Sequence, residues 1–241
     1  MKVKLILSYD GSKFYGFQEQ NSGVKTVSNT LKDALSLLGV EPKFNASGRT
    51  DRGVHATYQV IDLTLPKHWR DLIRFKTYLN RHLLPSIYVK SVKEVDESFH
   101  ARYDAKSRLY RYLIYKGKRS VFLSDYVIFK DSLDLDLLNS ASKLFEGKHD
   151  FGGFLKSGSD ENSTIRTIKR SFFYEYKDFY IYSVEANGFL RSQIRMMLSF
   201  LLKIDEKKLT RKELKDQLEL KKIYSKELVE SNGLYLSFVK Y

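Results

Sequence analysis

Residues 46–56 read ASGRTDRGVHA, and the sequence on either side of this run is apolar or typical of strands. Two glycines bracket the charged part of the run, and glycines permit the backbone angles of a tight turn and let a ligand approach the chain closely. We therefore interpret the stretch as a turn at the end of a strand. Asp51 stands in it between Arg49 and Arg52, whose positive charges favour the ionised carboxylate.

The spacing of this turn leaves two interpretations of Asp51 open. An ionised carboxylate is a poor general acid, but it can serve as a nucleophile or as an electrostatic anchor. The structural alternative is that Asp51 caps the next segment or pairs with one of the two arginines. The rest of the chain has to decide between them.

Outward from the turn, hydrophobic periodicity predicts the element order β-α-β-β-α-β for the first hundred residues. The predicted elements are a strand over 3–9, a helix over 26–38 capped by Thr26 or Ser28, a short segment over 42–46, a strand over 57–65, a helix carrying Leu72 to Leu83, and a strand over 87–95. This order is that of a ferredoxin-like unit.

The second half predicts a similar mixture of strands and helices. The predicted elements are a strand over 109–115, a helix over 135–145, a hairpin of 168–176 with 180–185, a helix over 188–203 capped by Asn187, a charged helix over 207–220 and a final strand over 234–241. We expect an α+β protein with two ferredoxin-like (RRM-like) halves, over 1–104 and 105–241, whose antiparallel sheets join into one extended platform.

Composition favours a polyanionic partner. The chain has 241 residues, of which 42% are apolar, so it can fill a core. Lysine and arginine total 42 against 29 acids, a net charge of +13. Such an excess indicates nucleic acid or, failing that, an anionic membrane surface.

The absence of cysteine excludes disulfides, cysteine-ligated metals and thiol catalysis. The five histidines never form the close pair of a helical zinc site, so we expect no metal. The N-terminus does not resemble a signal peptide, and the longest apolar run, around 196–202, is too short to span a bilayer. These features predict a cytoplasmic protein that does not cross a membrane.

The segment 108–115 is a second candidate for function. On a strand, Arg108, Tyr110 and Tyr112 share one face, and an arginine beside two phenols can grip a phosphate and stack on a base. The structural alternative is that tyrosine and arginine simply suit a half-exposed strand.

Arg191 and Arg195 lie one turn apart on the flank of the predicted helix over 188–203. Their stems border its apolar stripe, and a partly buried arginine usually pairs with a carboxylate. Asp51 is an available partner if the two halves close over it. Otherwise these arginines contact phosphate or solvent only.

Other catalytic patterns lack support. His149 and Asp150 are adjacent on a strand and point to opposite faces, so we expect His149 to be structural. No Gly-x-Ser-x-Gly sequence and no Walker-type loop occurs.

The chain resembles the bacterial tRNA pseudouridine synthase A family nearly from end to end. The segments that carry the resemblance are YDGS at 9–12 with YGFQ at 15–18, GRTD at 48–51 with GVHA at 53–56, FHAR at 99–102, the strand 108–115, RTI at 166–168, Phe189 with Arg195, and GLYL at 233–236. The stretch 48–56 is the most specific of them.

The resemblance implies a pseudouridine synthase fold and an isomerase that converts uridine to pseudouridine at positions 38, 39 and 40 of the tRNA anticodon stem-loop. It implies no cofactor and no metal, and a homodimer. Asp51 would be the nucleophile, attacking either C1′ of the sugar or C6 of the uracil, and the sequence does not choose between them.

The resemblance also implies the roles of the other site residues. Tyr110 would stack on the flipped uracil and help remove the C5 proton, and Arg195 would pair with Asp51. Arg49, Arg108 and Leu236 would contact the substrate. Arg52 and Phe17 stand where alanine and tryptophan are usual in the family, and neither is one of the implied catalytic residues.

Two other functions compete with the enzyme. An RNA-binding module without chemistry fits the charge and the tyrosines, but leaves the turn at 48–56 unexplained. An RNA-cleaving enzyme is weakened by the missing metal cluster and the missing histidine pair. The isomerase interpretation explains more of the residues singled out above than either alternative does.

Overall fold

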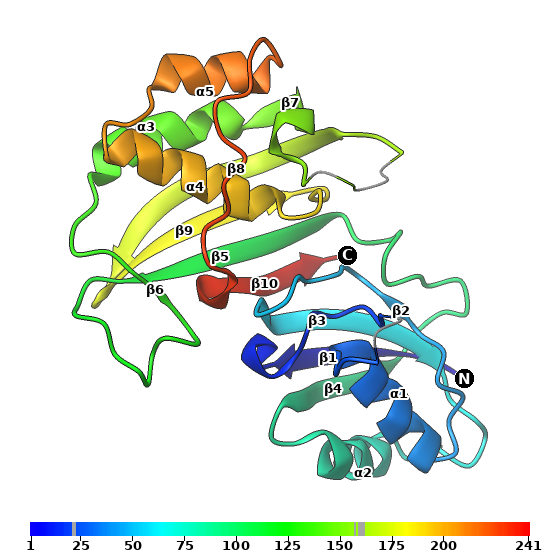
Figure 1. The fold of residues 1–241 in the computed structure, drawn as a ribbon. Helices are drawn as coiled ribbons and strands as arrows, with labels where there is room; N and C mark the ends of the chain where they lie inside the picture. Colours follow the sequence, from blue (N-terminus) through cyan, green and yellow to red (C-terminus); the bar gives the residue numbers. More distant parts are fainter. Residues whose placement is uncertain (21–22, 157, 159–161) are drawn as a thin grey trace. The chain divides into compact units, whose positions relative to one another are not determined.

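The computed structural model describes residues 1–20, 23–156, 158 and 162–241 (Figure 1). The described chain divides into two compact units. Unit 1 comprises residues 1–106 together with 235–241, and unit 2 comprises residues 107–234. The final strand is therefore part of unit 1, whereas the sequence predicts that it belongs to a half over 105–241.

Unit 1 has the predicted β-α-β-β-α-β order. Its elements are β1 (Lys2–Tyr9), a short 3-10 turn η1 (Gly11–Lys13), α1 (Val27–Leu37), β2 (Asn45–Ala46), β3 (His55–Thr64), α2 (Leu72–Leu83), β4 (Ile87–Glu94) and the unit's part of β10 (Leu234–Lys240). The sheet runs in the order β4-β1-β3-β10, and the short β2 pairs with β3 at Ile61 and Asp62 (Figure 1).

Local sequence explains these elements. Alternate residues of β1 are buried, as expected of a strand with one face on a core. Thr26 caps α1 by accepting the amide of Asn29, and Asp71 caps α2 by accepting the amides of Ile73 and Arg74. The prediction of Thr26 as a cap is thus confirmed.

One strand of unit 1 departs from the antiparallel expectation. Tyr235 and Leu236 of β10 pair in parallel with His55 and Ala56 of β3. The phenol of Tyr241 donates to the carbonyl of Ala101 at 2.7 Å, and this bond holds the end of the strand on the segment that follows β4.

Unit 2 has a second sheet with helices against it. Its elements are β5 (Ser107–Tyr115), β6 (Ile128–Phe129), α3 (Leu135–Ser142), η2 (Lys143–Phe145), β7 (Gly147–Asp150), η3 (Gly152–Phe154), β8 (Ile165–Tyr176), β9 (Phe179–Ala186), α4 (Gln193–Asp205), α5 (Arg211–Leu218) and η4 (Ser231–Gly233). The order is β5-β9-β8-β7, all antiparallel, and β6 pairs in parallel with β5.

The helix predicted over 188–203 begins at Gln193, five residues late. Ser192 has a left-handed backbone with φ of 60°, which a continuing right-handed helix does not permit. The side chain of Gln193 accepts the amide of Leu190 at 2.8 Å and fixes a turn there. Arg191 therefore lies outside the helix, and the prediction that it shares a helical flank with Arg195 was wrong.

Asn187 is not the cap of that helix. Its side chain accepts the amide of Thr167 at 3.0 Å, and so holds β8 instead. The charged helix predicted over 207–220 is also shorter, because Thr210 begins α5 with a reciprocal capping box to Glu213. The residues predicted to form the apolar stripe of the helix over 188–203 are all buried: Leu190, Ile194, Met197, Leu198, Leu201 and Leu202. Leu190 lies before α4, and Met196 and Phe200 beside the stripe are buried as well.

Candidate active site

The loop between β2 and β3, residues 47–54, is fixed at its base by buried side chains. The hydroxyl of Ser47 donates to Oε1 of Gln59 at 2.6 Å, and Nε2 of Gln59 donates to the carbonyl of Gly48 at 2.8 Å. Ser47 and Gln59 are both almost fully buried. These bonds replace solvent for the polar groups at the loop's base, so the loop leaves the sheet in one defined direction.

Bonds to the chain's first loop hold the tip of the 47–54 loop. The carbonyl of Thr50 accepts the amide of Phe17 at 3.0 Å, and the hydroxyls of Thr50 and Tyr9 are 2.9 Å apart. The amide of Val54 then donates to the carbonyl of Asp51 at 3.1 Å and closes the turn. These bonds confirm the predicted turn. Asp51 is half-buried at its tip.

Glycines make the close approach of the two loops possible. A Cβ at Gly11 would overlap the carbonyl oxygen of Val54. Gly16 has a φ of 101°, and a Cβ there would come within 3.1 Å of the carbonyl oxygen of Thr50. Neither position accommodates a larger residue without a shift of the 47–54 loop.

His55 joins the two loops on the buried side. Its Nδ1 accepts the amide of Gly11 at 3.0 Å, so that nitrogen carries no proton. The 3.4 Å between Nδ1 and the carboxylate of Asp10 is therefore a contact and not an ion pair. The sequence shows both segments but not this bond between them. In the structure, the end of β1 at Tyr9 lies beside the start of β3 at Ala56.

The two arginines beside Asp51 differ in their surroundings. The guanidinium of Arg52 stacks over the ring of Tyr15, 4.3 Å from its centroid. Arg49 is exposed, and its guanidinium makes no hydrogen bond or ion pair with the described residues. Leu236, predicted to contact substrate, is fully buried on β10 opposite Ala56 of β3.

Tyr110 and Arg108 lie on β5 of unit 2, on strand positions two apart. Tyr110 is 7% exposed and meets the ring of Phe189 edge to face, with 5.3 Å between centroids. Arg108 donates from Nη1 to the carbonyl of Asn187 at 2.7 Å. Both interactions lie against the segment that connects β9 to α4.

Arg195 is held by the segment 224–233, which connects α5 to β10 and which we call the strap. Nε of Arg195 donates to the carbonyl of Val229 at 2.9 Å, and the side chain is half-buried. The hydroxyl of Tyr112 donates to the next carbonyl, that of Glu230, at 2.6 Å. The strap thus orients Arg195, a predicted site residue, and Tyr112, which lies two residues from Tyr110 on β5.

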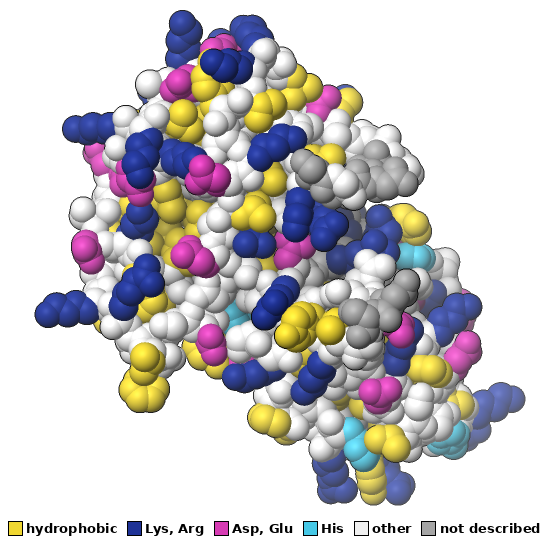
Figure 2. Space-filling view, viewed as in Figure 1, with side chains coloured by type: hydrophobic (Ala, Val, Ile, Leu, Met, Phe, Trp, Pro, Cys, Tyr) yellow, Lys and Arg dark blue, Asp and Glu magenta, His cyan; other side chains and the backbone are white. Residues whose placement is uncertain are grey.

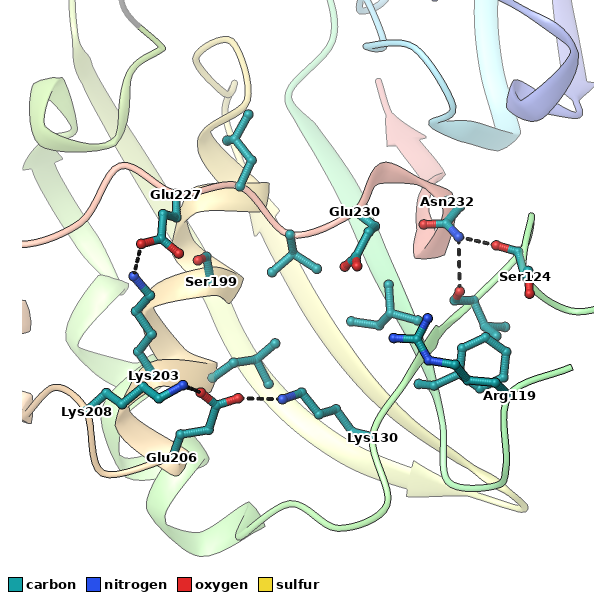
Figure 3. Close-up of a pocket in the computed structure, with 16 residues that line it drawn as sticks. Arg119, Ser124, Lys130, Ser199, Lys203, Glu206, Lys208, Glu227, Glu230 and Asn232 are labelled. Atoms are coloured by element: carbon teal, nitrogen blue, oxygen red, sulfur yellow. Dashed lines mark hydrogen bonds and ion pairs between the residues drawn. The ribbon is translucent and has the colours of Figure 1, made fainter. Parts of the chain in front are cut away.

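A cavity of about 520 Å³ lies beside the strap within unit 2, and none of the predicted site residues lines it (Figure 3). Three of its four cations are paired with acids: Glu206 binds Lys130 at 2.5 Å and Lys208 at 2.8 Å, and Glu227 binds Lys203 at 2.6 Å. The fourth, Arg119, has no acidic partner among the described residues. The hydrogen bonds from the two lysines lower the pKa of Glu206 from 4.5 to about 2. An ion-paired lining of this kind does not attract a strongly charged ligand.

Neither a metal centre nor a membrane span appears in the described part of the chain. Its histidine and acidic side chains form no group of three or more that could hold a metal ion. None of its helices is long and apolar enough to cross a bilayer.

The comparisons with known proteins cover most of the chain. A profile of the family described as tRNA pseudouridine synthase matches residues 5–104 and 141–241. A tRNA pseudouridine synthase A of Campylobacter jejuni is 43% identical over 241 residues, which is all of both chains. One of Wolinella succinogenes is 40% identical over 98% of this chain and 92% of its own, and one of Helicobacter pylori 38% identical over 99% and 98%.

A crystal structure of a Cbf5-Nop10-Gar1 complex aligns with 79% of this chain and 42% of its own at 15% identity, with a TM-score of only 0.33. The sequence relationships are far closer, and they extend through the 47–54 loop, β5 and α4. By these matches, the chain belongs to the tRNA pseudouridine synthase family.

Proposed function

We propose that this enzyme isomerises uridine to pseudouridine in tRNA, at positions 38, 39 and 40 of the anticodon stem-loop, with Asp51 as its nucleophile and without a cofactor. The observation that carries the proposal is the 47–54 loop. Its base, tip and neighbouring loop are all fixed by buried hydrogen bonds, and a half-buried carboxylate lies at its tip.

The balance of the reaction supports a cofactor-free mechanism. The bond from uracil N1 to C1′ of the ribose breaks, and a bond from C5 to C1′ forms. C5 loses its proton to solvent and N1 gains one. Substrate and product contain the same atoms in the same oxidation state, so the chemistry needs a nucleophile, a proton acceptor and a held base, but no oxidant or reductant.

In this proposal Asp51 attacks C1′ of the sugar or C6 of the uracil. A carboxylate is suited to this role when it is held ionised and in a fixed position. The glycines let the two loops pack closely against each other, which fixes the backbone on both sides of Asp51.

Tyr110 and Arg195 complete the proposed machinery. Tyr110 stacks on the flipped uracil and assists removal of the C5 proton, and its edge-to-face packing on Phe189 fixes the plane of its ring. Arg195 pairs with the carboxylate of Asp51. Its bond from Nε to Val229 sets the plane of the guanidinium from which the terminal nitrogens project.

Arg49 and Arg108 are proposed to bind the RNA around the reacting nucleotide. Leu236 is fully buried on β10, so we propose that it contacts only a base inserted against that strand. Flipping a base out of a stem costs a few kcal/mol. Contacts between cations and phosphates offset that cost, and Arg49 is exposed and without an acidic partner among the described residues. We propose that the enzyme works as a cytoplasmic homodimer.

The test is release of tritium from a tRNA transcript labelled at uridine C5. The wild-type protein should release it, and Asp51→Ala and Asp51→Asn should be slower by a factor on the order of 10⁴ or more. Asp33→Ala, which removes an exposed carboxylate from α1, is the matched control and should retain full activity.

Mapping the modified positions by sequencing then tests the site of modification. Tight tRNA binding by the wild type without any tritium release would instead support a binding module that lacks chemistry.

A further inference from the structure

The segment 67–81 of unit 1 carries an uncompensated cluster of positive charge. It contains five cations, Lys67, Arg70, Arg74, Lys76 and Arg81. None of them forms a side-chain hydrogen bond or ion pair with a residue that the structure describes. Asp71 is the only acid in the segment, and its carboxylate is engaged as the cap of α2, accepting the amides of Ile73 and Arg74 at 3.0 and 2.9 Å.

Aromatic rings support these cations. The guanidinium carbons of Arg74 and Arg81 lie 5.6 and 4.8 Å from the ring centroid of Tyr78. The ring of Trp69 lies 6.0 Å from that of Tyr78, and its indole nitrogen donates to the carbonyl of Leu38 at 2.9 Å. The guanidinium groups of Arg74 and Arg81 therefore pack on an aromatic ring whose neighbour, Trp69, is hydrogen-bonded to the rest of unit 1.

The same segment forms a hollow. Its volume is about 620 Å³, and its lining residues are Lys67, His68, Trp69, Arg70, Asp71 and Arg74. Figure 2 shows dark blue Lys and Arg side chains projecting at the end of unit 1 where Figure 1 draws α2. The surface combines a concave shape, exposed cations and aromatic faces, as surfaces that bind nucleic acid do.

Helix stability explains only part of this arrangement: Arg81 lies in the last turn of α2, where a positive charge favours the helix dipole. Arg74 lies in the first turn of α2, where a positive charge opposes the helix dipole. Two lysines on or just after α5 do have acidic partners: Lys215 lies 3.8 Å from Glu219, and Lys221 lies 3.7 Å from Asp216. On and before α2, none of the five cations has such a partner among the described residues.

The hollow lies at the end of the sheet opposite Asp51. β3 begins at His55, beside the 47–54 loop, and ends at Thr64, three residues before Lys67. Its ten residues span roughly 30 Å at about 3.3 Å per residue. A ligand that reaches both places must be a large, extended polyanion.

We propose that Lys67, Arg70, Arg74 and Arg81 form a second docking surface that binds the phosphate backbone of the tRNA body, away from the reacting nucleotide. We call it the α2 surface. The inference rests on the proposed function, because it assigns a second area of binding to the same substrate.

The experiment compares two quadruple variants. The first replaces Lys67, Arg70, Arg74 and Arg81 with glutamine. The control replaces Lys208, Lys212, Lys215 and Lys221 with glutamine, which removes the same charge from the region of α5. The dissociation constant for full-length unmodified tRNA is measured for each between about 50 and 200 mM salt, where the neutralisation of phosphates has its largest effect.

For the α2 variant, we expect the slope of log binding constant against log salt to become shallower by about 0.9 for each phosphate that the protein no longer neutralises, or about 2 to 4 in total. The turnover number at saturating tRNA should be unchanged. The control should keep the wild-type slope. A short hairpin that carries the target uridine but does not reach the hollow should show the same slope with all three proteins.

Three results would overturn the inference: an unchanged slope with full-length tRNA, an equally shallow slope in the α5 control, or an equal change with the short hairpin. An unchanged slope together with altered sedimentation would assign the surface to binding a second copy of the chain. Tritium release by the wild type is measured separately, so failure of the α2 surface remains distinguishable from failure of the proposed function.

Discussion

The imidazole of His55 lies almost flat against the phenol ring of Tyr235, with 4.6 Å between the ring centroids and 18° between the ring planes. His55 is the first residue of β3 and directly follows the 47–54 loop, and Tyr235 is its parallel partner on β10. Through Nδ1, the same imidazole accepts the amide of Gly11. One ring thus connects the last strand of unit 1, the 47–54 loop and the chain's first loop.

His55→Ala should destabilise unit 1 by about 2 to 4 kcal/mol, because it loses the ring stacking and leaves the buried amide of Gly11 without an acceptor. Chemical denaturation measures this loss, and tritium release at saturating tRNA should fall with it. His55→Asn, which offers an acceptor but no large ring, should recover part of the stability. Wild-type stability in His55→Ala would show that the bond to Gly11 is unimportant.

Gly11→Ala should displace the 47–54 loop, since the added Cβ overlaps the carbonyl oxygen of Val54. We expect a loss of about 2 kcal/mol or more and a lower turnover number, measured by thermal denaturation and tritium release. Gly188→Ala is the control, because a Cβ there meets only the Arg166 side chain at 3.7 Å or more. Equal effects of the two substitutions would contradict the prediction.

Tyr110→Phe keeps the ring and its packing on Phe189 but removes the hydroxyl. If that hydroxyl assists removal of the C5 proton, tritium release should fall by about 100-fold or more while tRNA affinity is unchanged. Tyr110→Leu should lose affinity as well, because it removes the stacking surface. Full activity in Tyr110→Phe would restrict Tyr110 to stacking.

Gln217→Leu should destabilise unit 2 by about 3 to 5 kcal/mol. The buried Gln217 side chain donates to the carbonyls of Gly153 and Ser225 and accepts the amides of Tyr224 and Ser225, so it anchors the start of the strap. Urea denaturation measures the loss. Lys212→Ala on the exposed face of α5 is the control, and a similar midpoint for both variants would refute the role of Gln217.

Glu206 should stabilise the folded protein at neutral pH and lose this effect on acidification. Its pKa is lowered from 4.5 to about 2 in the folded protein, so its contribution is present above pH 4.5 and is lost as pH falls toward 2. In Glu206→Gln the loss of stability relative to wild type should be below about 1 kcal/mol at neutral pH and should disappear in that window. Denaturation midpoints at several pH values test this, and a difference that grows on acidification would contradict it.

Local pattern was sufficient to predict most elements of both units. Alternation predicted β1 and β4, and helical periodicity with Thr26 predicted α1, because these signals depend on neighbours in sequence. The start of α4 was missed because the bond between the Gln193 side chain and the amide of Leu190, with Ser192 in a left-handed conformation, overrides an apolar pattern that continues upstream. The parallel register of β10 was missed because no local feature encodes which strand it joins.

The candidate site was predictable to a similar extent. Residues 48–56 carry a recognisable turn with its carboxylate, and the structure has that turn. Two hydrogen bonds at the site join residues far apart in sequence: the Gly11 amide to His55, and Arg195 to the carbonyl of Val229 in the strap. No spacing within either segment reveals such bonds. The catalytic and binding roles of Asp51, Tyr110, Arg195, Arg49, Arg108 and Leu236 stay predictions.

The discontinuity of unit 1 has a consequence for biosynthesis. β10 occupies the place beside β3, and it leaves the ribosome only after all of residues 107–234 have been made. During that interval the edge of β3 that β10 will cover remains open to pairing with other chains. Completion of unit 1 thus waits until residues 107–234 have been synthesised, and only then can the ring of Tyr235 reach His55.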